Sequence, residues 1–257
     1  MKHIISLAIL HIPRKYLQLV GHFIAKFLSI FYLGKGVQCP ICNHQYRKFL
    51  PYGRKARENS LCPNCLALER HRLLWVYLKN QTSLFHQEQR LLHIAPEYCF
   101  IDRFESLKHL DYLTADIESP LAKLKMDIHQ MPFDEHSFDC VLCNHVMEHL
   151  TDDRQAMKEI YRVLKPGGWA IIQVPFFPPF PDHTFEDPNI TTPGDRMKKF
   201  GQKDHVRLYG KDYKERLENC GFQVTEDHFV DSLTTDIVRK FALSKEAIYF
   251  CSKIQGT

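Results

Sequence analysis

Hydrophobic and polar residues follow their most regular pattern between residues 125 and 176. Val141, Leu142 and Cys143 form an apolar run of buried-strand length, and residues 169–174 form a second one. Between the runs, apolar residues recur at intervals of three and four, which predicts a helix; they are Ala156, Met157, Ile160, Tyr161 and Leu164. A strand, a crossover helix and a second strand make a βαβ unit, so we expect a largely parallel sheet.

The predicted helix has recognisable ends. Thr151 and Asp152 are N-cap candidates, and the Lys-Pro-Gly-Gly sequence at residues 165–168 ends it. Cys140 and Cys143 form a C-x-x-C pair, but they fall on the predicted strand, so we expect both to be buried core residues. Residues 90–97 are short, apolar and bounded by a proline, which predicts another parallel strand.

The first 36 residues have a different pattern. A short apolar run at residues 4–10 resembles part of a signal peptide, but no small-residue cleavage site follows it. Residues 16–33 then predict an amphipathic helix, since Lys26 at the centre disfavours a membrane span. Two interpretations remain open: the helix lies on a membrane surface, or it docks on its own protein.

Four cysteines are spaced as two knuckles. Cys39 and Cys42 form one C-x-x-C pair, Cys62 and Cys65 form a second pair, and nineteen residues separate the two pairs. Four thiolates at this spacing predict a tetrahedral structural Zn²⁺ site, because no ligand position is left open. Nine cysteines, an odd number, fit metal binding in a reducing compartment better than a disulfide framework, so we expect a cytoplasmic protein.

A linking helix is predicted directly after the knuckles. Residues 66–78 have amphipathic spacing, and we expect the charged group at residues 69–72 to lie on the surface.

Charge is distributed unevenly along the chain. The protein has 257 residues, 44% hydrophobic and 25% charged, as expected for a globular domain with a core. Residues 1–82 hold 13 Lys and Arg against 2 Asp and Glu, whereas residues 83–257 hold 21 against 28. A basic front end suggests nucleic acid, phosphate or an anionic membrane surface as a partner, and a solvated basic face is equally compatible with it.

Residues 125–176 closely resemble the second half of class I S-adenosylmethionine-dependent methyltransferases of the type 11 kind, and the resemblance covers most of residues 84–257. The resemblance is carried by D-x-x-x-M-P-F-x-x-x-S-F-D-x-V, by H-V-M-E-H-L and by E-I-Y-R-V-L-K-P-G-G. It implies a Rossmann-like α/β sheet of seven strands, mostly parallel with an antiparallel last strand. The second strand is then residues 112–116, and residues 222–225 and 247–251 are the sixth and seventh.

The resemblance also implies S-adenosylmethionine as a cofactor and assigns residues to it. Asp116 holds the ribose hydroxyls, Asp127 with Ile128 reads adenine, and Asn144 follows the fourth strand. At the first strand the sequence departs from the family, because His93 replaces the acidic residue and Ala95, Pro96 and Glu97 replace the glycine-rich turn. The pocket is therefore either rebuilt, with Glu97 accepting from the cofactor's ammonium group and His93 shaping the turn, or lost. We favour the rebuilt pocket, because the other positions match.

Candidate residues for catalysis follow the fourth and fifth strands. His145 follows Asn144, and a long proline-rich insertion at residues 176–209 carries Asp204, His205 and Arg207. These side chains either orient a methyl acceptor, with His205 taking a proton, or pin the insertion to its own domain. We assign His149, in the E-H-L sequence, to the start of the following helix.

The resulting expectation is a zinc-ribbon-bearing methyltransferase. The segments are an amphipathic helix at 1–36, a zinc ribbon at 37–66, a linking helix at 67–83 and the methyltransferase domain at 84–257. The acceptor stays open among RNA, a glycan or lipid, and a small molecule. Two alternatives remain: a non-catalytic nucleic-acid- or glycan-binding protein on a degenerate methyltransferase fold, and an interaction protein at a membrane surface, peripheral on its inner face.

Overall fold

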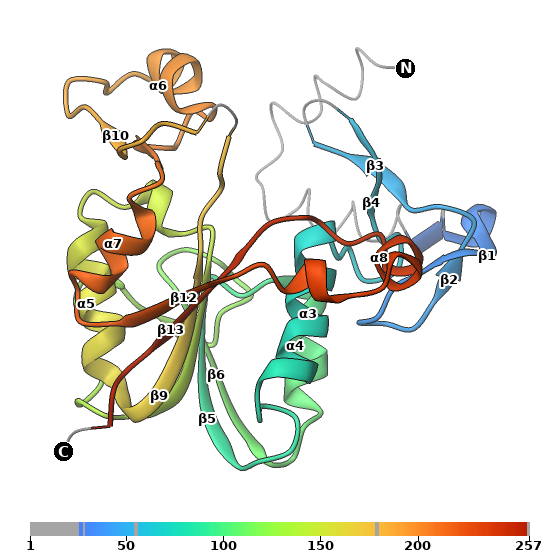
Figure 1. The fold of residues 1–257 in the computed structure, drawn as a ribbon, viewed down its shortest axis with the longest axis horizontal. Helices are drawn as coiled ribbons and strands as arrows, with labels where there is room; N and C mark the ends of the chain where they lie inside the picture. Colours follow the sequence, from blue (N-terminus) through green and yellow to red (C-terminus); the bar gives the residue numbers. More distant parts are fainter. Residues whose placement is uncertain (1–25, 28, 54–55, 178–179, 256–257) are drawn as a thin grey trace. The chain divides into compact units, whose positions relative to one another are not determined.

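The computed structural model describes residues 26–27, 29–53, 56–177 and 180–255 (Figure 1). Most of the predicted amphipathic helix at residues 16–33 therefore lies outside the described residues. The chain forms two compact units. The N-terminal unit contains residues up to Phe85 together with Glu97–Leu107 and Phe229–Glu246; the sheet unit contains His86–Pro96, Lys108–His228 and Ala247–Thr257.

A seven-stranded sheet organises the sheet unit. Its spatial order is β12-β13-β9-β8-β5-β6-β7. The strands are β5 (Gln89–Ile94), β6 (Leu110–Asp116), β7 (Leu124–Lys125), β8 (Phe138–Asn144), β9 (Leu164–Gln173), β12 (Gln223–Asp227) and β13 (Ile248–Ser252). Neighbouring strands from β9 to β7 are parallel, whereas β13 is antiparallel to both β9 and β12. This arrangement confirms the predicted fold class.

Two helices pack on one side of the sheet (Figure 1). They are α5 (Asp153–Val163) and α7 (Tyr213–Glu218). Helix α5 begins where Asp152 caps it, since its side chain accepts a 3.0 Å hydrogen bond from the Gln155 amide. Its apolar stripe and the central strands are buried together in one core, which includes Cys143, while Cys140 is also fully buried. The predicted βαβ unit and its two core cysteines are confirmed.

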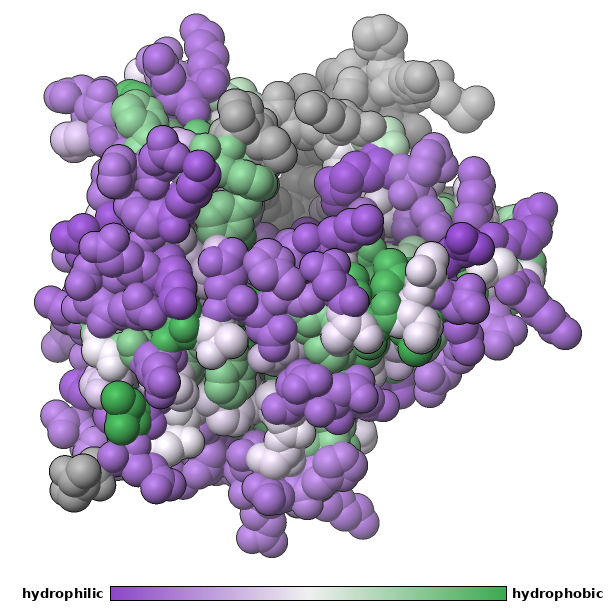
Figure 2. All heavy atoms as spheres, viewed as in Figure 1, coloured by the Kyte–Doolittle hydropathy of each residue, from purple (hydrophilic) through white to green (hydrophobic). Residues whose placement is uncertain are grey.

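The insertion after β9 has secondary structure of its own. Strands β10 (Phe185–Glu186) and β11 (Arg207–Leu208) pair antiparallel, and helix α6 (Pro193–Phe200) lies between them in sequence. In Figure 2, the region of α6 and β10 at the upper left has hydrophobic patches among hydrophilic ones. The exposed aromatic side chains of the insertion are Phe177, Phe180 and Phe185.

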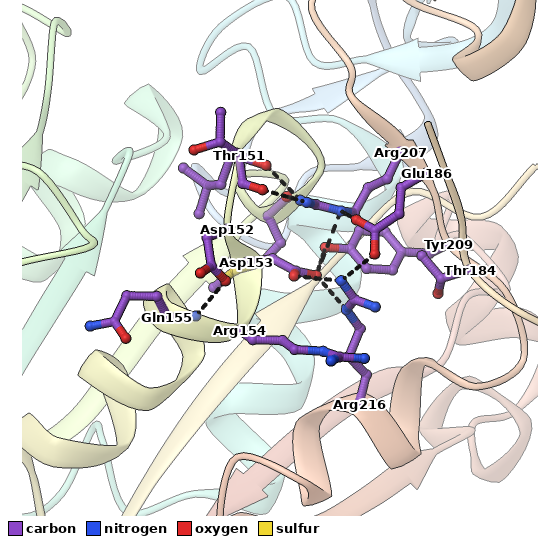
Figure 3. Close-up of polar contacts among 12 residues, drawn as sticks. Thr151, Asp152, Asp153, Arg154, Gln155, Thr184, Glu186, Arg207, Tyr209 and Arg216 are labelled. Atoms are coloured by element: carbon purple, nitrogen blue, oxygen red, sulfur yellow. Dashed lines mark hydrogen bonds and ion pairs between the residues drawn. The ribbon is translucent and has the colours of Figure 1, made fainter. Parts of the chain in front are cut away.

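A buried network of charges ties the insertion to α5 (Figure 3). The Arg216 guanidinium donates two 2.7 Å hydrogen bonds to the two carboxylate oxygens of Asp153, and Tyr209 Oη donates a third, also of 2.7 Å. Both arginine side chains, Arg207 and Arg216, also pair with Glu186 of β10, at 3.0 and 2.9 Å. The network therefore gives buried charges on α5, β11 and α7 partners of opposite sign.

The described part of the N-terminal unit contains two small pairs of antiparallel strands and several helices. Strand β1 (Leu33–Gln38) pairs with β2 (Gln45–Tyr46), and β3 (Leu50–Tyr52) pairs with β4 (Arg57–Leu61). The helices are α3 (Glu69–Gln81), α4 (Tyr98–Glu105) and α8 (Thr235–Phe241), with a 3₁₀ turn at Phe229–Ser232. Trp75 of α3 packs against Phe100 and Phe104 of α4, with ring centroids 5.9 and 5.7 Å apart. None of the described helices is both long and apolar enough to span a membrane.

The expectation that residues 69–72 lie on the surface is wrong for His71 and Arg72. Arg72 is completely buried, and its guanidinium donates to the carbonyl oxygens of Ser60, Ala67, Phe241 and Ala242 at 2.7 to 2.9 Å. A buried guanidinium is tolerated only when its donors are satisfied, and here backbone carbonyls satisfy them. Arg72 thus links β4 and the second cysteine knuckle to the C-terminus of α8.

The charge network yields a matched pair of substitutions on α5. Asp153→Ala leaves two buried arginines without this carboxylate, so we expect a loss of about 3–5 kcal/mol in the free energy of unfolding, measured by urea denaturation. Asp152→Ala removes only an exposed N-cap and should cost about 1 kcal/mol. Equal losses from the two substitutions would contradict a special role for the buried carboxylate.

The same variant has an expected pH dependence. Burial alone raises the pKa of Asp153, but the Arg216 hydrogen bond and the Arg207 charge outweigh it and lower that pKa below its usual range. A lowered folded-state pKa contributes stability above the unfolded value of about 3.9, and that contribution disappears as pH falls through the folded value. The stability difference between wild type and Asp153→Ala should therefore be constant from pH 5 to 7 and shrink below about pH 4.

Candidate cofactor and metal sites

The carboxyl ends of the parallel strands share one edge of the sheet. Ile94 at the end of β5 is in register with Ala115 of β6 and Cys143 of β8, and Asn144 is in register with Gln173 of β9. In doubly wound sheets this edge is where ligands bind. The residues predicted to hold the cofactor are grouped near this edge. Glu97 is the exception, because it belongs to the N-terminal unit and directly precedes α4.

Asp116 ends β6 at this edge. Its Oδ1 accepts hydrogen bonds from the amides of Glu118 and Ser119, at 2.7 and 2.5 Å. These bonds form a side-chain-capped turn, which fixes the carboxylate's orientation. Among the described residues Oδ2 has no hydrogen-bond partner, so one oxygen of the half-buried carboxylate remains to accept from a ligand.

Asp127 lies beside this turn because the Met126 amide donates a 3.0 Å hydrogen bond to the carbonyl of Asp116. Its Oδ1 accepts from the His129 amide at 2.9 Å and lies 2.7 Å from His129 Nδ1. The hydrogen bond from the amide, followed by that from the imidazole, lowers the pKa of Asp127. The carboxylate is exposed, whereas the next side chain, Ile128, is buried.

The turn after β5 keeps a glycine-like backbone without glycine. Ala95 has φ +51°, in the left-handed region, and its amide donates a 2.9 Å hydrogen bond to the Ala115 carbonyl. This conformation costs a residue with a Cβ about 1–2 kcal/mol. The departure from the family pattern therefore changes the side chain but not the type of turn.

His93 lies on strand β5, two residues before Ala95. Its side chain is fully buried, and Nδ1 is 2.8 Å from the Tyr112 hydroxyl on β6. The imidazole therefore links β5 to the neighbouring strand β6 through a buried hydrogen bond.

The edge continues at the end of β8. Asn144 is buried there, and the following His145 has φ +56°, with its amide donating 2.7 Å to the Gln173 carbonyl. His145 Nδ1 lies 3.6 Å from Glu148 Oε1. A second residue in the left-handed region thus stands at the end of the strand next to β5.

Glu148, His149 and His205 come together where the sequence suggested no such group. Their ligand atoms lie within 4.8 Å of one another, although His205 is far from the other two in the chain. Burial lowers the pKa of His205, which favours its neutral form. Glu148 was not predicted as a site residue, and His149 was assigned to a helix start. The spacing H-x-x-E-H at residues 145–149 is the signal that could have pointed to them, since it returns side chains to one side of a single helical turn.

Arg207 pins the loop that carries this group. Its guanidinium donates to the carbonyls of Met147, Leu150 and Thr151, at 2.6, 2.7 and 3.2 Å. The Val206 amide donates 2.9 Å to the Glu148 carbonyl. Arg207 therefore fits the interpretation that this group fixes the insertion to its own domain. His205 instead lies close to Glu148 and His149.

The four knuckle cysteines are gathered in the N-terminal unit. Cys39 Sγ is 3.6 Å from Cys65 Sγ, Cys42 Sγ is 3.7 Å from Cys62 Sγ, and all four sulfurs lie within 4.8 Å of one another. Each knuckle closes through a backbone hydrogen bond, from Asn43 to Cys39 and from Leu66 to Cys62. Asn43 and Leu66 both have positive φ, which turns the chain back tightly enough for paired sulfurs to converge.

Comparison with known proteins places a methyltransferase domain in this chain. Residues 96–172 match a family model described as a methyltransferase domain. The ubiquinone/menaquinone biosynthesis C-methyltransferase of Haemophilus ducreyi is 36% identical over 105 residues, which are 36% of this chain and 40% of the relative. The demethylmenaquinone methyltransferase of Chlorobaculum tepidum is 47% identical over 49 residues, 19% of this chain and 20% of the relative. The chain thus spans less than half the length of these relatives.

The solved structures that resemble the chain are distant in sequence. An S-adenosylmethionine-dependent methyltransferase from Archaeoglobus fulgidus is 16% identical, with a TM-score of 0.43, over 70% of this chain and 91% of that one. The family match covers residues 96–172, and the strand order is that of a mostly parallel α/β sheet.

The strained turn after β5 gives a prediction that needs no ligand. Ala95→Gly removes the Cβ from a left-handed residue, so we expect the free energy of unfolding to rise by about 0.5–1 kcal/mol in urea denaturation. Ala115→Gly, in the adjacent strand, is the matched control and should lower stability by about 1–2 kcal/mol, because it loses a buried methyl group and gains chain entropy. A loss of stability in Ala95→Gly as large as in the control would argue against strain at this turn.

Proposed function

We propose that the sheet unit is an S-adenosylmethionine-dependent methyltransferase. The observation that carries the proposal is the pair of carboxylates at the edge of the sheet. Asp116 and Asp127 are tied together by the Met126 hydrogen bond to the Asp116 carbonyl, on strands with the order of a methyltransferase sheet. The match of residues 96–172 to a methyltransferase domain supports the same activity.

Each carboxylate has a part of the cofactor that it suits. The open Oδ2 of Asp116 can accept from the ribose diol while Oδ1 keeps the turn in place. Asp127 can accept from the exocyclic amine of adenine, and the Ile128 amide can donate to the ring. The left-handed turn at Ala95 brings backbone close to a ligand, as glycine turns do elsewhere. Asn144 and His145 complete the edge.

Methyl transfer from a sulfonium to an acceptor is an in-line displacement, in which positioning and exclusion of water matter most. The insertion supplies exposed aromatic side chains, Phe177, Phe180 and Phe185, against which an acceptor can pack. His145 and His205 are the side chains we propose for proton handling. The acceptor classes are RNA, a glycan or lipid, and a small molecule.

We also propose that Cys39, Cys42, Cys62 and Cys65 hold a structural Zn²⁺ ion. Tetrahedral bonds of about 2.3 Å place sulfurs about 3.8 Å apart. The two measured separations of 3.6 and 3.7 Å fit that value. Four thiolates around Zn²⁺ carry a net charge of −2, and the buried Arg72, bonded to the carbonyl that follows Leu66, supplies nearby positive charge. The ion would hold together the segment around the knuckles, whose strands are only two to six residues long.

The cofactor proposal is tested by titrating S-adenosylmethionine into the full chain by calorimetry. Asp116→Ala and Asp127→Ala each remove a charged acceptor, whose hydrogen bonds are worth about 1.5–3 kcal/mol, so affinity should fall about tenfold to a hundredfold. Asp134→Ala, an exposed carboxylate outside the edge, should leave affinity unchanged. Absence of binding to the wild type at millimolar cofactor would instead favour a non-catalytic binding protein.

The zinc proposal is tested by elemental analysis of protein purified without chelator, with about one zinc per chain expected. Cys42→Ser should release the metal and unfold the N-terminal unit around the knuckles, while Cys140→Ser, on the sheet, should keep it. A metal-free wild type, or a Cys42→Ser variant that keeps its zinc, would count against this site.

A further inference from the structure

We propose that Glu148, His149 and His205 form a second metal site, which binds one divalent transition-metal ion. Glu148 Oε1 lies 3.9 Å from His149 Nε2 and 3.6 Å from His145 Nδ1. The rings of His149 and His205 meet edge to face, with centroids 4.8 Å apart. Nitrogen and oxygen ligands from two distant segments therefore converge on one small volume.

Two of the three side chains, Glu148 and His205, are buried and have polar atoms without partners in the part of the chain that the structure describes, whereas His149 is partly exposed and its Nδ1 lies 3.2 Å from the Asp204 carbonyl. His205 is 1% exposed, and neither of its ring nitrogens has a hydrogen-bond partner. Glu148 is 2% exposed, and its Oε2 is also unpartnered. Buried polar atoms are nearly always paired, and a buried carboxylate is tolerated when a cation is bound to it. The lone-pair nitrogen of a neutral His205 and the Glu148 carboxylate are both electron-pair donors, so together they point to a bound cation.

The donor set indicates the class of ion. Two imidazoles and one carboxylate suit Mn²⁺, Fe²⁺, Co²⁺, Ni²⁺ or Zn²⁺, unlike the soft thiolates of the four-cysteine site. Two ligands of one ion, each bonded at about 2.1 Å, lie about 3–4 Å apart. The ligand atoms here lie within 4.8 Å of one another, so small side-chain rotations close the site.

The protein holds both segments in place without using the ligand atoms. Val206 donates its amide to the Glu148 carbonyl, and Arg207 spans the carbonyls on both sides of the turn. Asp153 and Glu186 in turn hold Arg207, at 3.7 and 3.0 Å. A turn fixed by its backbone leaves its carboxylate and imidazoles available for an ion, as in other preorganised metal sites.

The position of the site suggests a role for the ion in methyl transfer, and this role rests on the proposed methyltransferase activity. It follows β8 directly, at the same edge of the sheet as the proposed cofactor residues. Three protein ligands leave coordination positions open, where a hydroxyl of the acceptor can bind and lose its proton to solvent. With the ion bound, His205 serves as a ligand, and proton handling is left to His145 and solvent. The resulting oxygen would form a bond to the methyl carbon while the carbon–sulfur bond breaks and its electron pair goes to sulfur. The site therefore favours acceptors that bear a hydroxyl group.

The test is a titration of zinc-loaded full-length protein with Mn²⁺, followed by electron paramagnetic resonance, since thiolates disfavour this ion. We expect one Mn²⁺ per chain. Glu148→Gln, nearly isosteric, and His149→Ala, at a partly exposed position, should each weaken binding at least tenfold. His205→Ala should do the same. Glu135→Gln and His183→Ala, exposed residues outside the cluster, are the matched controls and should bind as the wild type does.

Thermal unfolding separates loss of metal from loss of fold. Saturating Mn²⁺ should raise the melting temperature of the wild type and of both controls, but not of Glu148→Gln, whose melting temperature without metal should stay close to wild type. The inference is overturned if the wild type binds neither Mn²⁺ nor a second equivalent of Zn²⁺, or if the three cluster variants bind like the controls. Calorimetry with S-adenosylmethionine on the same samples keeps the proposals apart: cofactor binding without metal overturns only this site, and metal binding without cofactor overturns only the methyltransferase proposal.

Discussion

The buried pairing of Asp153 with Arg216 and Arg207 is the interaction on which the attachment of the insertion to α5 depends. Three chain segments meet there: the start of α5, strand β11 and helix α7 (Figure 3). Arg207 uses the rest of its guanidinium to hold the turn at residues 147–151. Because the charges are buried, breaking one pair leaves the others unpaired, which is much costlier than losing an exposed ion pair. The insertion is thereby kept in one position over the carboxyl end of β8.

This same edge carries several locally unfavourable features. Ala95 and His145 occupy the left-handed region at the ends of two neighbouring strands, and neither is glycine. Glu148 and His205 bury polar atoms that have no partners among the described residues. Strain and unsatisfied polar groups persist in folded proteins where the surrounding structure enforces them, and they cluster at binding and catalytic sites. The surrounding support here is the charge network and the apolar core beneath the sheet.

The N-terminal unit stabilises its buried charge in a different way. Its strands are short, and its polar core residue, Arg72, is buried among carbonyl oxygens instead of carboxylates. The second knuckle, the β4 strand and the end of α8 are all joined through this one side chain. A cationic group placed close to four convergent sulfurs gives the unit a charge balance that suits a metal–thiolate centre.

The sequence alone determined what depends on neighbours in the chain. Apolar periodicity located β8, α5 and β9, the short spacing of the cysteines paired them, and Asp152 capped the helix, because each of these features is decided within a few residues. The resemblance to the methyltransferase family assigned Asp116 to the end of the second strand, and β6 ends at this residue. Only the tertiary structure decided that Arg72 is buried, that His93 is buried against Tyr112, and that His205 lies next to Glu148. Those outcomes depend on contacts between distant segments, where burial and the need to satisfy buried polar atoms override local pattern.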